Sequence, residues 1–275
     1  MKKIKMIAMD CDGTLLTSDK KLSERNRQAL TAAIKKGVVV LPATGRPDSA
    51  LPEEVLGIPG IRYAIASNGG RVIDLQENKM IYSKTMSLEE GLTILSVMAK
   101  YDTYKEVFFD GVGYGEEEQL KKIQEYVLDE YMGSYLLKTR NPVKDFFKFI
   151  REKNMPFDKV QAIFKNLEEK EQASIEIKKI TGKDVIGAFA NNIEVNADGV
   201  NKSEGISHLA EYLGITIEEV MTFGDGMNDL EMIRDAGYGI AMKNAVQDVK
   251  DVAYYITDTN DQDGVAQAIE KFVLI

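Results

Sequence analysis

Short apolar runs alternate with amphipathic stretches along the first and last thirds of the chain. In the first third, apolar runs predict strands at Ile4–Met9, Val38–Leu41 and Tyr63–Ala66, and the periodicity of Ser23–Lys36 predicts a helix. In the last third, the same signals predict helices at Lys202–Leu213, Asp229–Ala236, Val246–Asp251 and from Val265 onward, and strands at Val220–Phe223, Tyr238–Ala241 and Ala253–Ile256. Strands that are apolar on both faces and separated by helices are typical of a mostly parallel sheet covered on both sides. The pattern therefore predicts an α/β fold.

The middle of the chain differs from the two outer thirds in its order of predicted helices and strands. Its pattern predicts helices at Leu88–Tyr101, Glu117–Tyr131, Val143–Lys153 and Leu167–Ile180, and strands at Glu106–Phe109, Lys159–Phe164 and Val185–Phe189. We interpret this segment as a second α/β domain inserted within the first. The expected domains are a core of residues 1–83 and 196–275 and an insert of residues 84–195. The glycine-rich stretch Gly111–Gly115 lacks the spacing of a dinucleotide-binding loop, so it predicts a hairpin or loop of the insert.

The residue composition removes most kinds of catalytic chemistry. The 275 residues include 1 Cys and 1 His, too few for a Cys/His zinc site, a two-His metal motif or a disulfide. His208 lies in a stretch with the pattern of an ordinary amphipathic helix, so we expect a helix-surface or partly packed residue rather than a catalyst. No Gly-x-x-x-x-Gly-Lys-Ser/Thr phosphate-binding loop occurs. Carboxylate, hydroxyl, amide and lysine chemistry remain.

Acidic residues outnumber basic residues by 44 to 35, which gives a net charge of -9. A broad contact with a phosphate backbone is therefore not expected, and nucleic acid is not the predicted partner. No apolar run approaches the roughly 18 to 20 residues that span a bilayer, and acidic residues interrupt the opening segment MKKIKMIAMDCDG before a signal-peptide core could form. We expect a soluble cytoplasmic protein without membrane contact, and its oligomeric state stays open.

Polar clusters follow four of the predicted strands. Asp10–Thr14 follows the first strand, Ala43–Arg46 the second, Ser67–Gly69 the third, and Gly224–Asp229 the strand at Val220–Phe223. The carboxyl ends of parallel strands share one edge of the sheet, where ligands bind. The four clusters are therefore expected to converge on one site.

The acidic residues of these clusters predict a metal site. Asp10 and Asp12 are two positions apart, so on an extended segment their side chains leave the same face while Cys11 points away into the packing. Close carboxylates repel each other unless a proton or a cation lies between them, and Asp225 and Asp229 add further negative charge. Any one of these acids could simply cap a helix or turn. Four acids at two strand ends favour a hard divalent cation, and Mg²⁺ fits better than Ca²⁺ because no EF-hand spacing is present.

Cations at two predicted helix starts indicate an anionic substrate. Capping-box spacing from Asn201 places Lys202 in the first turn of a helix, where its charge opposes the helix dipole. Arg46 precedes Pro47 at another predicted helix start, and Gly45 leaves room for backbone N–H groups to meet an anion. Judged alone, Lys202 could be a solvated surface lysine. We interpret it as a phosphate-binding residue and expect Lys202→Ala to cost little stability.

Taken together, the four clusters resemble the four motifs of the haloacid dehalogenase superfamily. D-x-D-G-T follows the first strand, A-T-G-R-P follows the second, a lysine stands at a late helix start, and G-D-G-M-N-D follows a late strand. The inserted segment resembles the α/β cap of the Cof-like, type IIB subgroup, and the resemblance covers essentially the whole chain. It implies a Rossmann-like parallel-sheet core domain with an inserted α/β cap domain. One departure is Lys202-Ser203, where the family usually has Lys-Gly.

The resemblance also implies a role for each matching residue. Asp10 would be the nucleophile and a metal ligand, and Asp12 would be the general acid and base, with its backbone carbonyl on the metal. The other implied binding residues are Asp225 and Asp229 for the metal, and Thr44, Gly45, Lys202 and Asn228 for the phosphate. Arg46 and Asn68 are candidate substrate contacts. Asn228 also has capping-box spacing to Glu231, so a purely structural role is the alternative for it.

These roles imply a Mg²⁺-dependent phosphomonoester hydrolase that acts on a small phosphorylated metabolite through an aspartyl-phosphate. We expect Asp12 to be kept protonated by its neighbours. We also expect four carboxylates opposed by Lys202 alone to repel the substrate unless Mg²⁺ is bound. The insert is expected to select the leaving group, and sugar phosphates, flavin phosphates and pyridoxal phosphates all remain open.

Three alternatives are kept. A phosphomutase would use the same core but return the phosphoryl group to its substrate, so release of inorganic phosphate distinguishes the two enzymes. A receiver-type signalling domain also combines an acid pair, a Thr, a Lys and Mg²⁺, but receivers are about half this length or less and have no inserted domain. A binding protein without catalysis is the third, and the complete set of acids argues against it.

Overall fold

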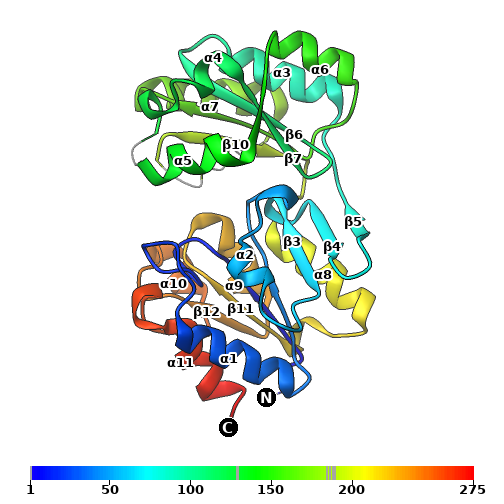
Figure 1. Cartoon of the computed structure of the whole chain (residues 1–275), viewed down its shortest axis with the longest axis vertical. Coiled ribbons are helices and arrows are strands. Elements are labelled where there is room, and N and C mark those ends of the chain that lie inside the picture. The colour runs from blue at the N-terminus through cyan, green and yellow to red at the C-terminus, as the bar shows by residue number, and fades with distance from the viewer. Residues whose placement is uncertain (1, 128–129, 184, 186, 188–189) are drawn as a thin grey trace. The chain divides into compact units, whose positions relative to one another are not determined.

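The computed structural model describes residues 2–127, 130–183, 185, 187 and 190–275. The chain divides into two compact units (Figure 1). The first, here called the core unit, comprises Met1–Arg46, Leu51–Ser83 and Gly199–Ile275. The second, the insert unit, comprises Pro47–Ala50 and Lys84–Asp198. The short segment Pro47–Ala50 therefore belongs to the insert unit although core segments flank it on both sides.

A five-stranded parallel sheet forms the centre of the core unit, as predicted. Its order is β13-β12-β11-β1-β2, with strands β1 (Met6–Met9), β2 (Val39–Pro42), β11 (Val220–Gly224), β12 (Tyr238–Ala241) and β13 (Tyr255–Ile256). Every residue of β1 is buried, and Met6 pairs in parallel with Val39 on one side and Val220 on the other. A strand buried on both faces must be apolar throughout, which explains the unbroken run MIAM.

Helices of the core unit lie close to their predicted positions. They are α1 (Glu24–Lys35), α8 (Lys202–Leu213), α9 (Leu230–Asp235), α10 (Gln247–Val252) and α11 (Gly264–Phe272). The short helix α2 (Glu53–Leu56) was not predicted. Helices α1 and α11 pack against each other, and α9 contacts both α8 and α10. At the start of α8, the Asn201 side chain accepts a hydrogen bond from the Glu204 N–H, which satisfies one of the free backbone donors of the first turn. This cap makes Lys202 the first residue of α8.

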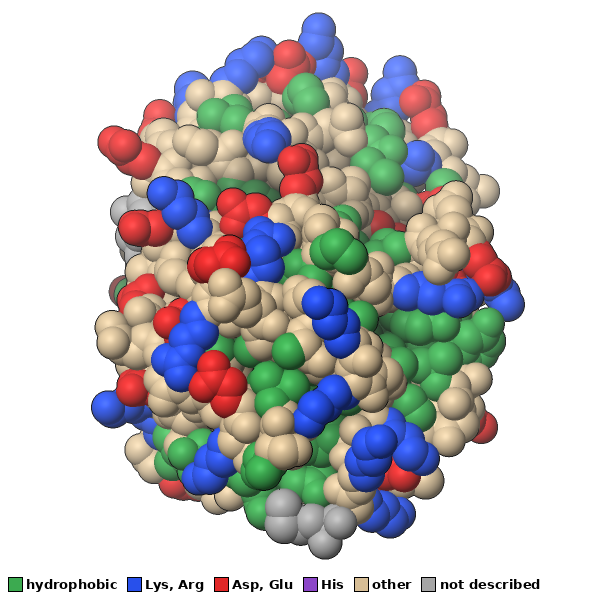
Figure 2. Space-filling model, turned by 60° about the horizontal axis from the view of Figure 1, so that its bottom comes forward, with side chains coloured by type: hydrophobic (Ala, Val, Ile, Leu, Met, Phe, Trp, Pro, Cys, Tyr) green, Lys and Arg blue, Asp and Glu red, His purple; other side chains and the backbone are tan. Residues whose placement is uncertain are grey.

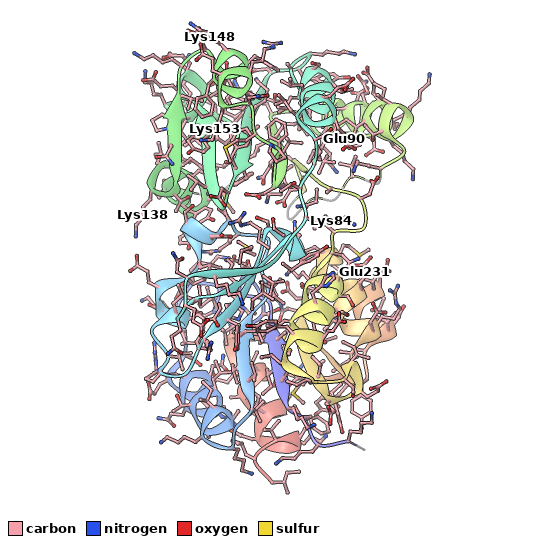
Figure 3. All side chains as sticks on the ribbon, turned by 90° about the vertical axis from the view of Figure 1, so that its right-hand side faces the viewer. Lys84, Glu90, Lys138, Lys148, Lys153 and Glu231 are labelled. Carbon is pink, nitrogen blue, oxygen red and sulfur yellow. The ribbon has the colours of Figure 1, made fainter. Side chains whose placement is uncertain are left out.

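A small antiparallel sheet lies beside the parallel one. Its strands are β3 (Tyr63–Ala66), β4 (Arg71–Asp74) and β5 (Lys79–Ser83), in the order β3-β4-β5. The sequence predicts only β3 and places it in the parallel sheet, where it makes no more than a single bridge between Ala43 and Ile65. Strand β5 escapes prediction because its side chains are mostly exposed and show no apolar alternation. Figure 3 shows Lys84 where the chain leaves β5.

The insert unit is built on a second sheet, of order β10-β9-β6-β7-β8. Its strands are β6 (Thr103–Phe109), β7 (Val112–Glu116), β8 (Arg140–Val143), β9 (Lys159–Phe164) and β10 (Asn192–Asn196). Its helices are α3 (Leu88–Met98), α4 (Glu117–Leu120), α5 (Glu130–Thr139), α6 (Phe146–Lys153) and α7 (Leu167–Thr181). In Figure 3, Glu90 marks α3, Lys138 marks α5, and Lys148 and Lys153 mark α6.

Several predicted elements of the insert are wrong in their bounds. The predicted helix Glu117–Tyr131 is interrupted, because α4 ends at Leu120 and α5 begins only at Glu130. The predicted helix Val143–Lys153 begins three residues late, after Asp145 takes a left-handed backbone conformation (φ 46°). Three residues of the predicted strand Val185–Phe189 lie outside the described residues, and Val185 and Gly187 are not in a strand. The predicted hairpin at Gly111–Gly115 is confirmed, since β6 and β7 are joined by a turn at Asp110 and Gly111.

Charged side chains of both signs are mixed over the surface. Figure 2 shows Lys and Arg side chains interspersed with Asp and Glu side chains on the face that it presents. None of the helices in the described part of the chain is long and apolar enough to cross a membrane.

Candidate active site

The four polar clusters meet in the core unit at the carboxyl end of the parallel sheet. Asp10 directly follows β1, and its N–H donates to the carbonyl of Phe223 in β11 (3.0 Å). The Lys202 ammonium donates to Oδ1 of Asp10 and to Oδ1 of Asp229, each at 2.6 Å. Lys202 is fully buried. It therefore joins the start of α8 to the loop after β1 and to the loop after β11 inside the protein.

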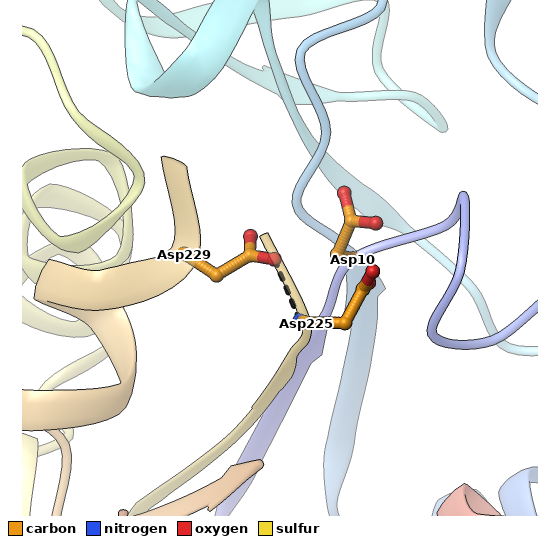
Figure 4. Close-up of side chains that lie close together, drawn as sticks. All are labelled: Asp10, Asp225 and Asp229. Atoms are coloured by element: carbon orange, nitrogen blue, oxygen red, sulfur yellow. Dashed lines mark hydrogen bonds between the residues drawn. The ribbon is translucent and has the colours of Figure 1, made fainter. Parts of the chain in front are cut away.

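Three further hydrogen bonds fix the acidic loop that follows β11. Oδ2 of Asp229 accepts a hydrogen bond from the N–H of Asp225 (2.9 Å, Figure 4) and another from the N–H of Gly226 (3.0 Å), so this carboxylate braces its own loop. The buried Thr14 hydroxyl donates to Oδ1 of Asp225 at 2.6 Å. A β-carbon at Gly13 would lie 2.5 Å from Oδ2 of Asp225, so only glycine allows the two loops to approach this closely.

The three carboxylates form a cluster that suits a divalent cation. Asp10, Asp225 and Asp229 each offer one oxygen, and these oxygens all lie within 4.8 Å of one another (Figure 4). Burial raises the pKa of Asp10 to about 8, against the opposing charge of Lys202 and with help from the neighbouring carboxylates. Burial and the charge of Asp229 likewise raise the pKa of Asp225 to about 6. Carboxylates that resist ionisation in this way are stabilised when a hard cation supplies the missing positive charge.

The environment of Lys202 contradicts the expectation that its removal would cost little stability. Burial alone would lower the pKa of the ammonium, but the charges of Asp10 and Asp229 outweigh it and raise the pKa. Replacing Lys202 by Ala would leave two buried carboxylates without their shared cation. Breaking a buried ion pair by removing one partner costs about 3–5 kcal/mol, far more than the relief of an opposed helix dipole.

Asp12 lies in a different electrostatic environment from Asp10. Its carboxylate accepts two hydrogen bonds from the Arg46 guanidinium (2.8 and 2.9 Å) and one from the Lys20 ammonium (3.0 Å). Burial opposes ionisation, but these bonds and charges lower the pKa of Asp12 below its ordinary value. The expectation that its neighbours keep Asp12 protonated is therefore wrong. The carboxylates of the site also face Arg46 and Lys20 besides Lys202, so Lys202 is not their sole opposing charge.

The predicted phosphate-binding residues also lie in this region. Thr44 is buried, and its Oγ1 accepts a hydrogen bond from the Arg46 N–H (3.2 Å). Gly45 lies against the Asn68 side chain, whose Oδ1 would be 2.7 Å from a β-carbon at that position. Asn228 does not cap a helix with its side chain; its Nδ2 donates to Oδ1 of Asn68 (3.3 Å) instead. The two amides therefore face each other.

The structure also adds two residues that the sequence reasoning did not assign to the site. Thr14 ends the first polar cluster, and its hydroxyl holds Asp225. Lys20 carried no sequence signal because it stands in a polar loop. Cys11 is fully buried and burial raises its pKa, as expected for a packed thiol. His208 is partly buried and stacks on Tyr82 with ring centroids 3.7 Å apart, which confirms its packing role.

Comparison with known proteins agrees with this geometry. Residues 7–269 match the family model of the haloacid dehalogenase-like hydrolases. The chain belongs to this family. A curated relative, the 5-amino-6-(5-phospho-D-ribitylamino)uracil phosphatase YcsE of Bacillus subtilis (strain 168), is 33% identical over 98% of this chain and 96% of its own length.

Solved structures of haloacid dehalogenase-like hydrolases share the whole fold. One from Bacteroides thetaiotaomicron has a TM-score of 0.81 and 31% identity, covering 98% of this chain and 99% of its own. The subclass IIB sugar phosphatase BT4131 has a TM-score of 0.84 and 26% identity, covering 98% and 100%. The resemblance to a Cof-like member of this family is confirmed, and the chain is an enzyme of the phosphatase class.

Proposed function

We propose that the enzyme is a Mg²⁺-dependent phosphomonoester hydrolase that acts through a covalent phosphoryl group on Asp10. The observation that carries the proposal is the fully buried Lys202 bridging Asp10 and Asp229, with Asp225 close by. The two carboxylates stabilise the buried Lys202 even without a phosphate. The same contacts hold the ammonium beside the proposed nucleophile, Asp10, and in-line phosphoryl transfer requires a cation at that place.

The chemistry of the donor set fits Mg²⁺. Asp10 and Asp225 would hold the ion together with the backbone carbonyl of Asp12, and Asp229 would act from the loop that it braces. Oxygen ligands from few carboxylates, with room left for water and a phosphate oxygen, are what Mg²⁺ prefers. When bound, the ion would neutralise charge on the phosphate and keep the Asp10 carboxylate ionised.

In the proposed transfer step, Asp10 attacks the phosphate and other residues of the core unit hold it. One carboxylate oxygen of Asp10 attacks phosphorus while the leaving oxygen departs on the opposite side. Lys202, the Thr44 hydroxyl, the Gly45 N–H and the Asn228 amide would hold the remaining phosphate oxygens. Because Lys202 is already fixed by Asp10 and Asp229, it needs no reorganisation when the negative charge shifts during transfer.

Asp12 would move the protons. Its ionised state, favoured by Arg46 and Lys20, suits the second step, in which it takes a proton from the water that releases phosphate from Asp10. The first step needs a proton on Asp12 for the leaving oxygen. We propose that the contacts of Arg46 and Lys20 with Asp12 loosen when the phosphate of the substrate enters, because the new anion competes for both cations.

We further propose that residues 84–195 form a cap that selects the leaving group. On one face of the insert sheet, strand register places Gln161 between Glu106 and Glu194, and all three side chains are buried. Arg140 binds Glu106 at 2.6 Å and Lys159 binds Glu194 at 2.8 Å, so these charges are neutralised in pairs. The named relatives act on a phosphoribitylamino compound and on sugar phosphates, which supports a polyhydroxylated phosphomonoester as the substrate class here.

Release of inorganic phosphate from a panel of phosphomonoesters, with Mg²⁺ and with a chelator, tests the proposal. If the enzyme is a hydrolase, we expect phosphate release that depends on Mg²⁺, with sugar and polyol phosphates among the better substrates. Transfer of the phosphoryl group to a second position of the substrate without phosphate release would instead identify a mutase. Full activity in the chelator would contradict the assigned metal.

A further inference from the structure

Asn68 stands between two residues that would bind the phosphate. Its backbone N–H donates to the carbonyl of Thr44 (3.1 Å), and its side-chain Oδ1 accepts from Nδ2 of Asn228 (3.3 Å). Only 3% of its surface is exposed, so the side chain is enclosed by the loops that it joins. Asn68 thus connects the loop after β2 with the loop after β11, although these loops are distant in sequence.

The loop that carries Asn68 has an unusual backbone. Three successive residues adopt positive φ values, namely Ser67 (φ 51°), Asn68 (φ 57°) and Gly69 (φ 100°). Residues other than glycine rarely adopt such values, and here two of them do so in succession. A β-carbon at Gly69 would overlap the backbone carbonyl of Asn201, so the loop also abuts the start of the helix that carries Lys202. The conformation brings the Asn68 side chain inward, between Gly45 and Asn228.

We propose that Asn68 is a positioning residue for the phosphate site and acts through Asn228 rather than by touching the substrate. Its carbonyl oxygen engages one Nδ2 hydrogen of Asn228 and thereby fixes the rotation of that amide. The second hydrogen is then directed at a phosphate oxygen without loss of side-chain freedom on binding. The inference rests on the proposed function, because it takes Asn228 to be a phosphate ligand.

A double-mutant cycle tests this coupling. Asn68→Gly removes the amide and tolerates the left-handed backbone, so the loop should keep its course. The readouts are KM and kcat for p-nitrophenyl phosphate with Mg²⁺, and the rise in melting temperature that inorganic phosphate causes. We expect KM to rise and phosphate affinity to fall by about threefold to tenfold, the worth of one hydrogen bond, with a smaller change in kcat. In an Asn228→Ala background the same substitution should have almost no further effect.

The control is Asn78→Gly, which changes another left-handed asparagine (φ 48°) in the exposed turn between β4 and β5. It should leave KM, kcat and phosphate affinity unchanged. If Asn68→Gly does not fold, Asn68→Ser gives the same comparison, because its side chain is shorter than that of asparagine and Ser67 already adopts the left-handed conformation in this loop. Equal losses with and without the Asn228 side chain would show that Asn68 acts on the phosphate by itself and overturn the inference, as would no loss at all. If the unmodified enzyme releases no phosphate, the proposed function fails, and the phosphate-induced stabilisation still decides whether Asn68 and Asn228 are coupled.

Discussion

The hydroxyl of Thr14 donates a 2.6 Å hydrogen bond to Oδ1 of Asp225, a residue 211 positions later in the chain. Thr14 is fully buried, and the bond favours the ionised carboxylate against the burial and the charge of Asp229 that raise its pKa. One oxygen of Asp225 is thereby fixed in position. The loop after β1 therefore contributes to the carboxylate cluster in two ways: it carries Asp10, and its Thr14 orients the side chain of Asp225.

From this bond we predict that Thr14→Val weakens metal binding without removing any ligand. Valine has the shape of threonine but lacks the donor, so Asp225 loses its orientation and becomes harder to ionise. The Mg²⁺ concentration that gives half-maximal activity should rise about tenfold or more, as is typical when a group that orients a metal ligand is lost. Thr17→Val is the matched control, because the Thr17 hydroxyl bonds only the nearby carbonyl and N–H of Lys21 at the surface. An unchanged Mg²⁺ requirement in Thr14→Val would show that the bond has no part in metal binding.

Asp10→Asn should abolish turnover and leave the fold nearly intact. An amide is a poor nucleophile, and it also removes a negative charge that the metal would need. Lys202 keeps Asp229 as a partner, so the buried ammonium is not left alone. Asp19→Asn, at an exposed position of the same region, serves as the control and should behave like the unmodified enzyme. Phosphate release measures the loss of turnover, and thermal unfolding measures whether the fold is kept. A variant that retains a tenth of the turnover rate of the unmodified enzyme would exclude a covalent step on Asp10.

Lys202→Met should destabilise the metal-free protein, and more so at pH 8.5 than at pH 5.5. Methionine keeps much of the volume of lysine, so the change isolates the charge. Burial already raises the pKa of Asp10 to about 8, and without Lys202 that pKa must rise further. At pH 5.5 Asp10 is protonated with or without the lysine, so the loss there comes from Asp229, whose buried carboxylate loses its cation at either pH. At pH 8.5 the unmodified protein holds an ionised, paired Asp10, whereas the variant must bind a proton or bury an unpaired charge.

The expected loss for Lys202→Met is about 3–5 kcal/mol at the higher pH, the usual consequence of removing one partner of a buried ion pair. Chemical denaturation in a chelator at both pH values measures it, with Lys138→Met as an exposed control (Figure 3). A loss below about 1 kcal/mol at pH 8.5 would restore the sequence-based view that Lys202 contributes little to stability.

The convergence of the site was predictable because it follows from a few local signals. Buried strands such as MIAM identify themselves by unbroken apolar character, and the polar residues that follow such strands must share one edge of a parallel sheet. The pairing of the charges was not predictable. Whether Lys202 faces solvent or two carboxylates depends on the distance between α8 and the loop after β11, which no local pattern records.

The same reason explains the other errors. Arg46 and Lys20 lower the pKa of Asp12 through contacts that span 34 and 8 positions, and neither spacing belongs to a periodic element. Strand β5 escaped prediction because its side chains are mostly exposed, and β4 because its apolar part is only two residues, Val72 and Ile73, between the charged Arg71 and Asp74. In the insert, Asp145 delays the start of α6 by adopting a left-handed backbone, which asparagine and aspartate do without a clear sequence signal.

Exchange of the insert for that of a relative with another substrate preference should transfer the preference. The core unit contains the proposed nucleophile, acid/base residue and phosphate ligands. Hydrolysis of p-nitrophenyl phosphate and its Mg²⁺ dependence should therefore persist, while kcat/KM changes between natural substrates.

The exchange has to include residues 47–50 together with residues 84–198. Ser49 donates its N–H to the carbonyl of Gly111, and a β-carbon at Gly111 would collide with Asp48, so this short segment and the β6–β7 turn are fitted to each other. A chimera that exchanges residues 84–198 alone is expected to be less stable than one that exchanges both. If the complete chimera folds and ranks substrates as the parent does, the core unit selects the leaving group and the proposed role of the insert is wrong.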